Sequence, residues 1–307
     1  MNIIGKRYLF FALSLLIIVP GLAILIVRAA QHDLPLAIDF TGGSLLEVKF
    51  SKASPQPAEL IALYENQGLK DVQVQTTEKE TFVIRSTFLS DADRAAILAA
   101  MEKAYGAVEV IRFDSVGPSI GQQVTRNGAI AVAVAALAIL VYITLAFRKV
   151  EHAFRYGVCA IIAMVHDVAV VFSVVAIGSV LFGWEMDALF LTALLTVIGF
   201  SVQDKIVVFD RIRENSGPLR RLEFEQLVNH SIVQTLQRSI NTQLMTVEFL
   251  LLAMALMGGV TLREFSVVLL VGLLSGTYSS IFIAAAVLVL WEKREWETWF
   301  RRKPAAA

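Results

Sequence analysis

Long apolar runs alternate with short charged segments along most of the chain. Six of the runs come close to the roughly 20 apolar residues that a helix needs to cross a bilayer. They lie at residues 8–27, 129–147, 156–182, 188–209, 238–257 and 265–290. Arg28 and His32 follow the first run where a signal peptide would have a small-residue cleavage site, so we expect a retained anchor. The pattern predicts a polytopic α-helical membrane protein with six transmembrane helices.

Lysine and arginine are concentrated in alternate loops, which predicts the orientation of the chain. They gather before the first run, after the second, after the fourth and after the sixth, at Lys6, Arg7, Arg148, Lys149, Arg155, Arg211, Arg213, Arg220, Arg221, Lys293, Arg294, Arg301, Arg302 and Lys303. The positive-inside rule therefore places both termini in the cytoplasm and the long segment after the first run outside. We expect residues 210–237 to form a cytoplasmic loop, with an amphipathic helix over 219–236 on the inner membrane surface.

The segment between the first two runs has the pattern of a soluble domain. It contains four stretches that alternate like strands and two with helical spacing, namely strands at 45–50, 72–76, 81–86 and 108–113 and helices at 57–67 and 91–105. The order β-α-β-β-α-β predicts one ferredoxin-like α+β domain on the extracytoplasmic side. The chain thus divides into the cytoplasmic N-terminus with the first helix, this external domain, the remaining helices and a basic cytoplasmic tail, at 1–28, 29–125, 126–292 and 293–307.

Composition supports this interpretation and excludes several classes of function. The chain is 56% hydrophobic and 18% charged, so its excess apolar surface must face lipid. A net charge of zero gives no indication of a nucleic-acid partner. Cys159 is the single cysteine, which excludes an internal disulfide and a multi-thiolate metal site. The sequence has no glycine-rich phosphate-binding loop, so we expect no ATP site, no cofactor and no enzymatic activity.

Asp204 is the most informative ionisable residue inside the predicted helices. Such residues cost about 3 kcal/mol on insertion scales and persist where they are paired, hydrated or functional. At about 1.5 Å per residue from Arg211, Asp204 lies about 10 Å inside the cytoplasmic end of its run. Small or polar residues lead toward it along one helix face, at Thr192, Thr196, Gly199 and Gln203. We interpret Asp204 as a reversible proton carrier, with a hydrogen-bonded packing residue as the alternative.

Other charged residues at membrane depth are candidate partners of Asp204. Arg238 is predicted to open the fifth helix, with Asn241 and Glu248 on the same face. Its fixed positive charge can pair with an ionised Asp204, or it can snorkel to lipid phosphates. Glu248 must be protonated, paired or hydrated. Lys205 either snorkels to the cytoplasmic surface or pairs nearby and acts on Asp204.

His166 and Asp167 form a second polar pair near the middle of the third predicted helix. Adjacent helical residues point about 100° apart, so the two side chains need not contact each other. They suit either a proton relay or a hydrogen bond between helices, and the sequence leaves both open.

Glycines indicate two places of close approach or turning. Gly272, Gly276 and Ser280 form a small-xxx-small ridge in the sixth predicted helix, and together with Ser275 and Ser279 they indicate tight packing rather than chemistry. The pair Gly42-Gly43 predicts a hinge or tight turn where the external domain leaves the membrane.

Four motifs together resemble the SecF family of protein-export membrane subunits. They are Asp39-Phe40-Thr41-Gly42-Gly43, His166-Asp167, the run 201–215 and Arg238-Ser239-Ile240-Asn241-Thr242. The resemblance covers nearly the whole chain. It implies a one-to-one complex with SecD in a pseudo-symmetric twelve-helix body of the resistance-nodulation-division (RND) type, of which this chain is half. It also implies that Asp204 is a proton-path residue and that Arg238 belongs to the same polar network.

The same resemblance implies a function in Sec-dependent protein export across the bacterial plasma membrane. The complex would assist the SecYEG channel and the SecA motor, with YajC in a larger assembly surrounded by membrane lipids. It would draw unfolded polypeptide outward with the proton-motive force. The family usually has Asn before the aspartate and Thr or Ser after it, where this chain has Gln203 and Lys205. These differences leave the coupling ion, proton or sodium, open, and Glu248 could substitute for a missing polar partner.

Three other classes of function compete with this interpretation. RND-type exporters of small molecules or lipids commonly have two large external domains and twelve spans, whereas this chain predicts one small domain and six. An intramembrane aspartic protease would use Asp167 and Asp204 to share a proton, but the residues before Asp204 lack a glycine-containing approach. A structural scaffold would tolerate neutral replacement of Asp204 if the packing volume were kept.

Overall fold

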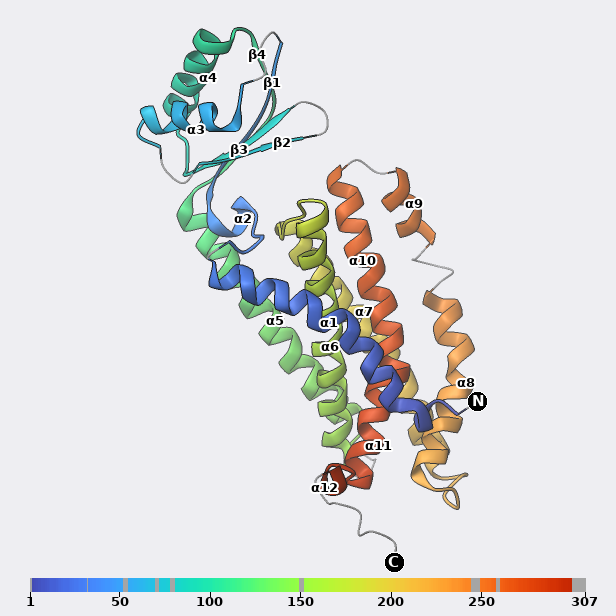
Figure 1. Cartoon of the computed structure of the whole chain (residues 1–307). Coiled ribbons are helices and arrows are strands. Elements are labelled where there is room, and N and C mark those ends of the chain that lie inside the picture. The colour runs from blue at the N-terminus through green and yellow to red at the C-terminus, as the bar shows by residue number, and fades with distance from the viewer. Residues whose placement is uncertain are drawn as a thin grey trace, which may run out of the picture. The chain divides into compact units, whose positions relative to one another are not determined.

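The chain folds into two compact units. The computed structural model describes residues 2–31, 33–51, 55–69, 72–77, 81–148, 152–243, 249–257 and 260–299. One unit is helical and consists of Met1–Pro35 and Ala131–Ala307 (Figure 1). The other consists of Leu36–Ile130 and contains the β-sheet.

The smaller unit is a four-stranded antiparallel sheet with two helices on one face. In chain order its elements are α2 (Ile38–Thr41), β1 (Gly43–Phe50), α3 (Pro57–Asn66), β2 (Gln73–Thr76), β3 (Phe82–Ser86), α4 (Asp91–Tyr105) and β4 (Val108–Val116). The strand order is β2-β3-β1-β4. Leu46 and Val48, two residues apart in β1, share a buried cluster with Leu60 of α3 and Ile97 of α4. The order of strands and helices is the predicted β-α-β-β-α-β order.

Two glycines with positive φ form the turn into β1. Gly42 (φ 72°) follows α2, and Gly43 (φ 120°) begins the strand. Side chains disfavour this backbone conformation, which glycine adopts readily. A Cβ on Gly42 would also lie 2.8 Å from the Cα of Pro118, where α5 (Pro118–Ala146) begins. The structure thus has a tight turn at the predicted Gly42-Gly43 position.

The larger unit is built from helices. Its elements are η1 (Ile4–Lys6), α1 (Arg7–Ala30), α5 (Pro118–Ala146, whose first turns belong to the smaller unit), α6 (Ala153–Leu181), α7 (Ala188–Ser216), α8 (Phe224–Gln243), α9 (Phe249–Met257), α10 (Val260–Ser279), the π-helical turn η3 (Ser280–Ala284), α11 (Ala285–Lys293) and α12 (Trp296–Trp299). Within the described ranges, five segments are long and apolar enough to cross a membrane, namely Ile4–Ala30, Pro118–Ala146, Ala153–Leu181, Ala188–Ser216 and Leu262–Lys293. They correspond to five of the six predicted spans.

The fifth predicted span, 238–257, differs from the structure. Helix α8 runs through Arg238 without a break. The predicted helix start at Arg238 is therefore wrong, and the helix predicted over 219–236 is part of a helix that begins at Phe224 and continues to Gln243. The predicted loop 210–237 contains the end of α7 and most of α8.

One buried face runs through α8 on both sides of Arg238, up to Ser239 and Gln243, which explains why the helix continues past the predicted boundary. Ser231 donates to the Leu227 carbonyl at 2.8 Å, and Thr235 donates to the Ser231 carbonyl at 3.2 Å. Both residues are buried, and α8 packs against α7. Because their hydrogen bonds are satisfied by their own helix, these polar residues do not end it. The residues between α8 and α9, including Glu248, lie outside the described part of the chain.

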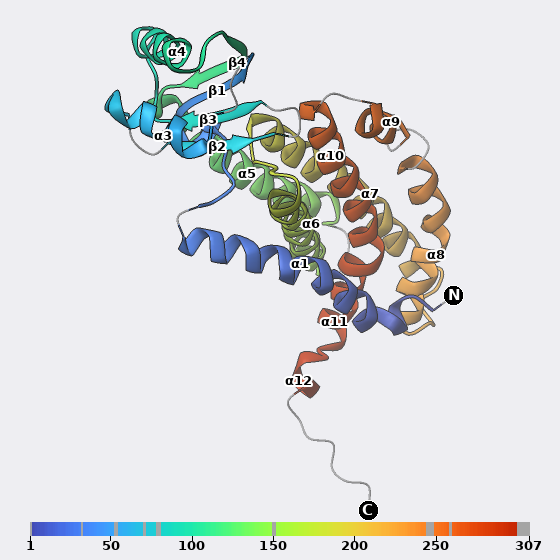
Figure 2. The same cartoon turned by 45° about the horizontal axis from the view of Figure 1, so that its top comes forward.

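Helices α6, α7 and α10 pack side by side, and α1 lies against α6 (Figure 2). A Cβ on Gly272 of α10 would overlap Val197 of α7. One on Gly276 would lie 3.1 Å from the Cβ of Ser201. Small residues at such contacts allow two helix backbones to approach closely. This close approach brings the polar faces of the three helices together.

Candidate functional site

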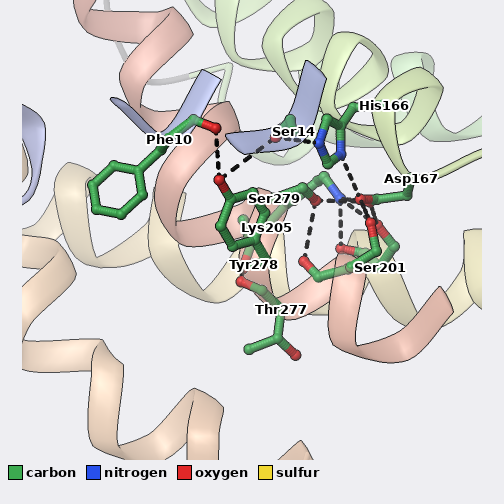
Figure 3. A network of polar contacts seen from close by, with 12 residues as sticks. Phe10, Ser14, His166, Asp167, Ser201, Lys205, Thr277, Tyr278 and Ser279 are labelled. Carbon is green, nitrogen blue, oxygen red and sulfur yellow. Dashed lines mark hydrogen bonds and ion pairs between the residues drawn. The ribbon is translucent and has the colours of Figure 1, made fainter. Parts of the chain in front are cut away.

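Three helices of the larger unit direct polar side chains toward a common point (Figure 3). Helix α6 contributes Asp167, α7 contributes Ser201 and Lys205, and α10 contributes Ser275 and Ser279. The two residues from α7 are four positions apart, as are the two from α10. Each pair therefore shares one helix face, which is how the three helices meet through polar groups.

Asp167 is 1% exposed, and its carboxylate is hydrogen-bonded at both oxygens. Oδ1 accepts from Ser275 Oγ at 2.8 Å and lies 3.1 Å from His166 Nδ1. Oδ2 accepts from Lys205 Nζ at 2.9 Å, from Ser279 Oγ at 2.7 Å and from the Ser201 hydroxyl. Burial of charge is costly unless a counter-charge and hydrogen bonds replace water, and here both do. Asp167 and Lys205 thus form a fully compensated buried ion pair.

Lys205 is completely buried, and its ammonium is bound inside the helical unit. Besides Asp167, it donates to the Ser201 carbonyl at 3.2 Å and to the Ser201 hydroxyl. The predicted snorkelling of Lys205 to the surface is wrong, because these oxygen atoms replace water as its partners. The other alternative, a pair with a nearby group, is what the structure has, and the partner is Asp167.

Asp204 is also buried, at 7% exposure, but in very different surroundings. Among the described residues its carboxylate has one hydrogen bond, from Thr277 Oγ1 to Oδ2 at 3.1 Å. The same hydroxyl lies 3.3 Å from the Leu273 carbonyl, which is a competing acceptor. Lys205 and Arg238 interact with Asp204 as charges without bonding to it. The negative charge of Asp204 is therefore far less compensated than that of Asp167.

The other predicted partners of Asp204 lie outside the buried cluster. Gln203 of α7 and Arg238 and Asn241 of α8 are exposed. Within the described part of the chain, Arg238 makes no ion pair with Asp204. Glu248 lies outside that part. The side chains of Gln203, Arg238 and Asn241 therefore lie at the surface of this chain.

His166 connects the buried ion pair to α1 (Figure 3). Its Nε2 lies 2.8 Å from Ser14 Oγ, and its ring stacks on Tyr278 with centroids 6.0 Å apart. Tyr278 donates to the Phe10 carbonyl at 2.7 Å and lies 3.5 Å from Ser14 Oγ. An ionised Asp167 can only accept, so Nδ1 carries a proton, and a neutral His166 accepts from Ser14 through Nε2. The two adjacent residues thus do contact each other, although their helical positions do not require it.

Hydroxyl residues, namely several serines and Thr277, are the site residues that the sequence did not predict. The sequence pattern assigns Ser275 and Ser279 to packing alone, yet both donate to Asp167. Their spacing of four residues, repeated by Ser201 and Lys205 in α7, is the signal that identifies one polar face. Ser14 gives no such signal, because it stands alone in its apolar run.

The arrangement suits ion exchange better than covalent catalysis. Asp167 bonds to Lys205 while Asp204 bonds to Thr277, so the two carboxylates are not arranged as the shared-proton pair of an aspartic protease. The described residues contain no group of three or more His, Cys, Asp or Glu that could hold a metal ion. The site therefore offers two buried carboxylates with unlike degrees of compensation.

Known proteins are similar to this sequence over its whole length. A family model described as "Protein export membrane protein SecD/SecF, C-terminal" matches residues 96–294, and the "SecD/SecF GG Motif" model matches residues 34–54. The protein translocase subunit SecF of Anaerolinea thermophila is 64% identical and covers 100% of both chains. That of Thermobaculum terrenum is 46% identical and covers 100% of this chain and 99% of the relative.

A solved structure shares the fold. The crystal structure of SecDF, a translocon-associated membrane protein from Thermus thermophilus, superposes with a TM-score of 0.78 at 34% identity. The match covers 96% of this chain and 39% of that chain, so this chain spans well under half of its length. With a family model over most of its residues and full-length relatives at this level of identity, the chain belongs to the SecD/SecF family of protein export membrane proteins.

Proposed function

We propose that this chain is a SecF-type subunit of the bacterial protein-export machinery and that it couples export to an ion gradient through Asp204. Relatives that match its whole length are named protein translocase subunit SecF. The protein translocase subunit SecDF of Thermus thermophilus aligns with 95% of this chain at 33% identity, over 39% of its own length. This relationship supports a one-to-one complex with SecD, which would supply the other half of the RND-type membrane body.

The finer topology is part of the proposal. We infer that α8, α9 and the residues between them supply the sixth span and that both termini face the cytoplasm of a bacterium. The excess of Lys and Arg in alternate loops supports this orientation. We also infer that the smaller unit is a ferredoxin-like domain outside the plasma membrane, which its β2-β3-β1-β4 strand order supports. SecYEG, SecA and YajC would complete the larger assembly.

The contrast between two buried carboxylates carries the ion-coupling role. Asp167 has Lys205 and several further donors around it, so its charge is compensated where it stands. Asp204 has one hydroxyl donor among the described residues and interacts with Lys205 and Arg238 only as charges that do not bond to it. A proton can therefore bind to Asp204 without first displacing a bound counter-ion. Exchangeable carboxyls at membrane depth are typical of proton paths.

Proton binding at Asp204 would change the contacts between α7 and its neighbours. The ionised carboxylate accepts a hydrogen bond from Thr277, whereas the neutral acid can donate one and no longer attracts Arg238. The Thr277 hydroxyl can then bond to the Leu273 carbonyl of its own helix instead. A ligand shifts a conformational equilibrium by its difference in affinity for the two states. This exchange of partners is the step by which proton entry would move helices.

Gradient-driven export by Asp204→Asn tests the proposal. The variant is reconstituted with SecD, SecYEG and SecA in vesicles with an imposed proton gradient. We expect export to fall to the level seen without a gradient, while the complex with SecD still assembles. Asp210→Asn is the matched control, because Asp210 lies on the same helix, is partly exposed and pairs with Arg213.

Three outcomes are distinguishable. Normal stimulation by Asp204→Asn would reject the ion-coupling role. Loss of assembly would point to a packing role for this residue. If the wild type transports drugs or lipids and protein export is the same with and without this chain, the RND-type small-molecule exporter is favoured.

A further inference from the structure

The ammonium of Lys205 lies in a cage of oxygen atoms of the kind that binds small cations. Its Nζ is 2.9 Å from Asp167 Oδ2 and 3.2 Å from the Ser201 carbonyl oxygen, and it also contacts Ser201 Oγ. The hydroxyl of Ser279 binds the same carboxylate oxygen at 2.7 Å. Carboxylate, carbonyl and hydroxyl oxygens are the ligands of hard cations in proteins. The surroundings of the ammonium therefore have the chemistry of a cation site.

Burial makes a counter-charge next to Asp167 strongly stabilising. Asp167, Ser201, Lys205 and Ser279 are each at most 2% exposed. A carboxylate in such surroundings is strongly destabilising when its counter-charge is removed. His166, which faces Asp167 from the same helix, is the other group in contact with the carboxylate that can become positive. Because the ammonium of Lys205 is covalently attached to α7, it cannot exchange with ions in solution.

We propose that Lys205 is a tethered cation that fills a monovalent-cation site around Asp167 and keeps Na⁺ out of it. Lys205 is then a specificity-determining residue, since Asp204 is left as the exchangeable carboxylate. Replacing Lys205 with a small hydroxyl residue removes the occupant but keeps the oxygen ligands on α6, α7 and α10. The emptied site takes Na⁺. This assignment rests on the proposed ion-coupling function, but ion binding to the purified protein can be measured without any export.

The test compares Na⁺ binding in full-length chains purified with SecD. All variants carry Asp204→Asn, so that this carboxylate does not contribute. Binding of ²²Na⁺ and the midpoint of thermal unfolding are measured in NaCl and in choline chloride at equal ionic strength and fixed pH. With Lys205 present, we expect the same midpoint in both salts. With Lys205→Ser, we expect about one additional bound Na⁺ per chain and a midpoint that rises with Na⁺ concentration, since a ligand of the folded state stabilises it by mass action.

A double variant separates the Asp167 site from other sites. Asp167→Asn with Lys205→Met removes both charges and most of the cavity, so it should lose the Na⁺ response. An equal Na⁺ response in this control would overturn the proposal, because the ion would then lie elsewhere. A Lys205→Ser chain that is stabilised by lower pH but not by Na⁺ would also overturn it, because a proton would then neutralise Asp167.

A second substitution at Lys205 keeps the test possible if the first variant does not fold. If Lys205→Ser cannot be purified in either salt, Lys205→Gln keeps more of the side-chain volume and takes its place. The same dependence on Na⁺ is expected, and a chain without that dependence contradicts the tethered-cation role.

Discussion

The buried pair between Asp167 and Lys205 predicts strongly coupled effects of mutation. Asp167→Asn keeps the size of the side chain and one carbonyl oxygen, so Ser275 or Ser279 can still donate to it. The ammonium of Lys205, which is 0% exposed, is left without its counter-charge. Lys205→Met produces the opposite defect, because the carboxylate loses the cation at 2.9 Å.

The expected change in the free energy of unfolding follows from the burial of both charged groups. Removing one partner of a buried ion pair costs about 3–5 kcal/mol, because the other charge stays buried and uncompensated. Removing both charges together leaves neither defect, so the double variant should be more stable than either single variant. We therefore expect a favourable coupling energy of about 2–3 kcal/mol between the two positions.

Tryptophan fluorescence can follow this coupling during unfolding in mixed detergent micelles. All four tryptophans belong to the larger unit, at positions Trp184, Trp291, Trp296 and Trp299, so their signal reports the unit that contains the pair. The experiment is done in choline chloride, so that Na⁺ cannot replace the missing ammonium. Additive losses, with the double variant as unstable as the sum of the single variants, would refute the ion-pair account.

Two further predictions concern packing and pH. Gly272→Ala should destabilise the larger unit by about 1–3 kcal/mol, because the added Cβ overlaps Val197. Gly199→Ala should be neutral or stabilising by up to about 1 kcal/mol, since among the described residues no atom beyond its chain neighbours and its own helix backbone lies within 4 Å of the added Cβ. Equal losses for the two variants in the same unfolding assay would contradict the packing account. The hydrogen bond from Lys293 holds the pKa of Glu225 below its usual value, so the stability from this carboxylate is present above its unfolded pKa of about 4.3 and is lost as pH falls through the lower folded-state pKa. Glu225→Gln should reduce the loss of stability measured between neutral and acidic pH, and an unchanged acid dependence would count against this ion pair.

Hydrophobic periodicity predicted most of the fold, because burial and lipid exposure act on whole segments. Five of the six predicted spans and each strand and helix of the smaller unit have counterparts in the structure. Arg238 shows where this reasoning ends. A charged residue beside an apolar run has the pattern of a helix start, but α8 continues through Arg238 because its buried face extends from Leu227 to Gln243.

Side-chain pairing within the site could not be predicted from one sequence. Lys205 is the chain neighbour of Asp204, yet successive helical residues point about 100° apart, so the partner of each depends on which helix packs beside it. Helix α6 places Asp167 next to Lys205, and α10 places Thr277 next to Asp204. A serine is small enough to serve only in packing, but its hydroxyl can also donate a hydrogen bond. Ser275 and Ser279 donate because Asp167 of the neighbouring helix lies beside them.

The most direct measurement identifies which buried carboxyl gains a proton. Infrared difference spectra of the purified complex between acidic and alkaline pH detect the C=O band of a protonated carboxyl group. If Lys205 fixes the charge of Asp167 while Asp204 exchanges, one component of the C=O absorption that forms at acidic pH will persist in Asp167→Asn and be lost in Asp204→Asn. A band that disappears in Asp167→Asn and persists in Asp204→Asn would contradict these roles.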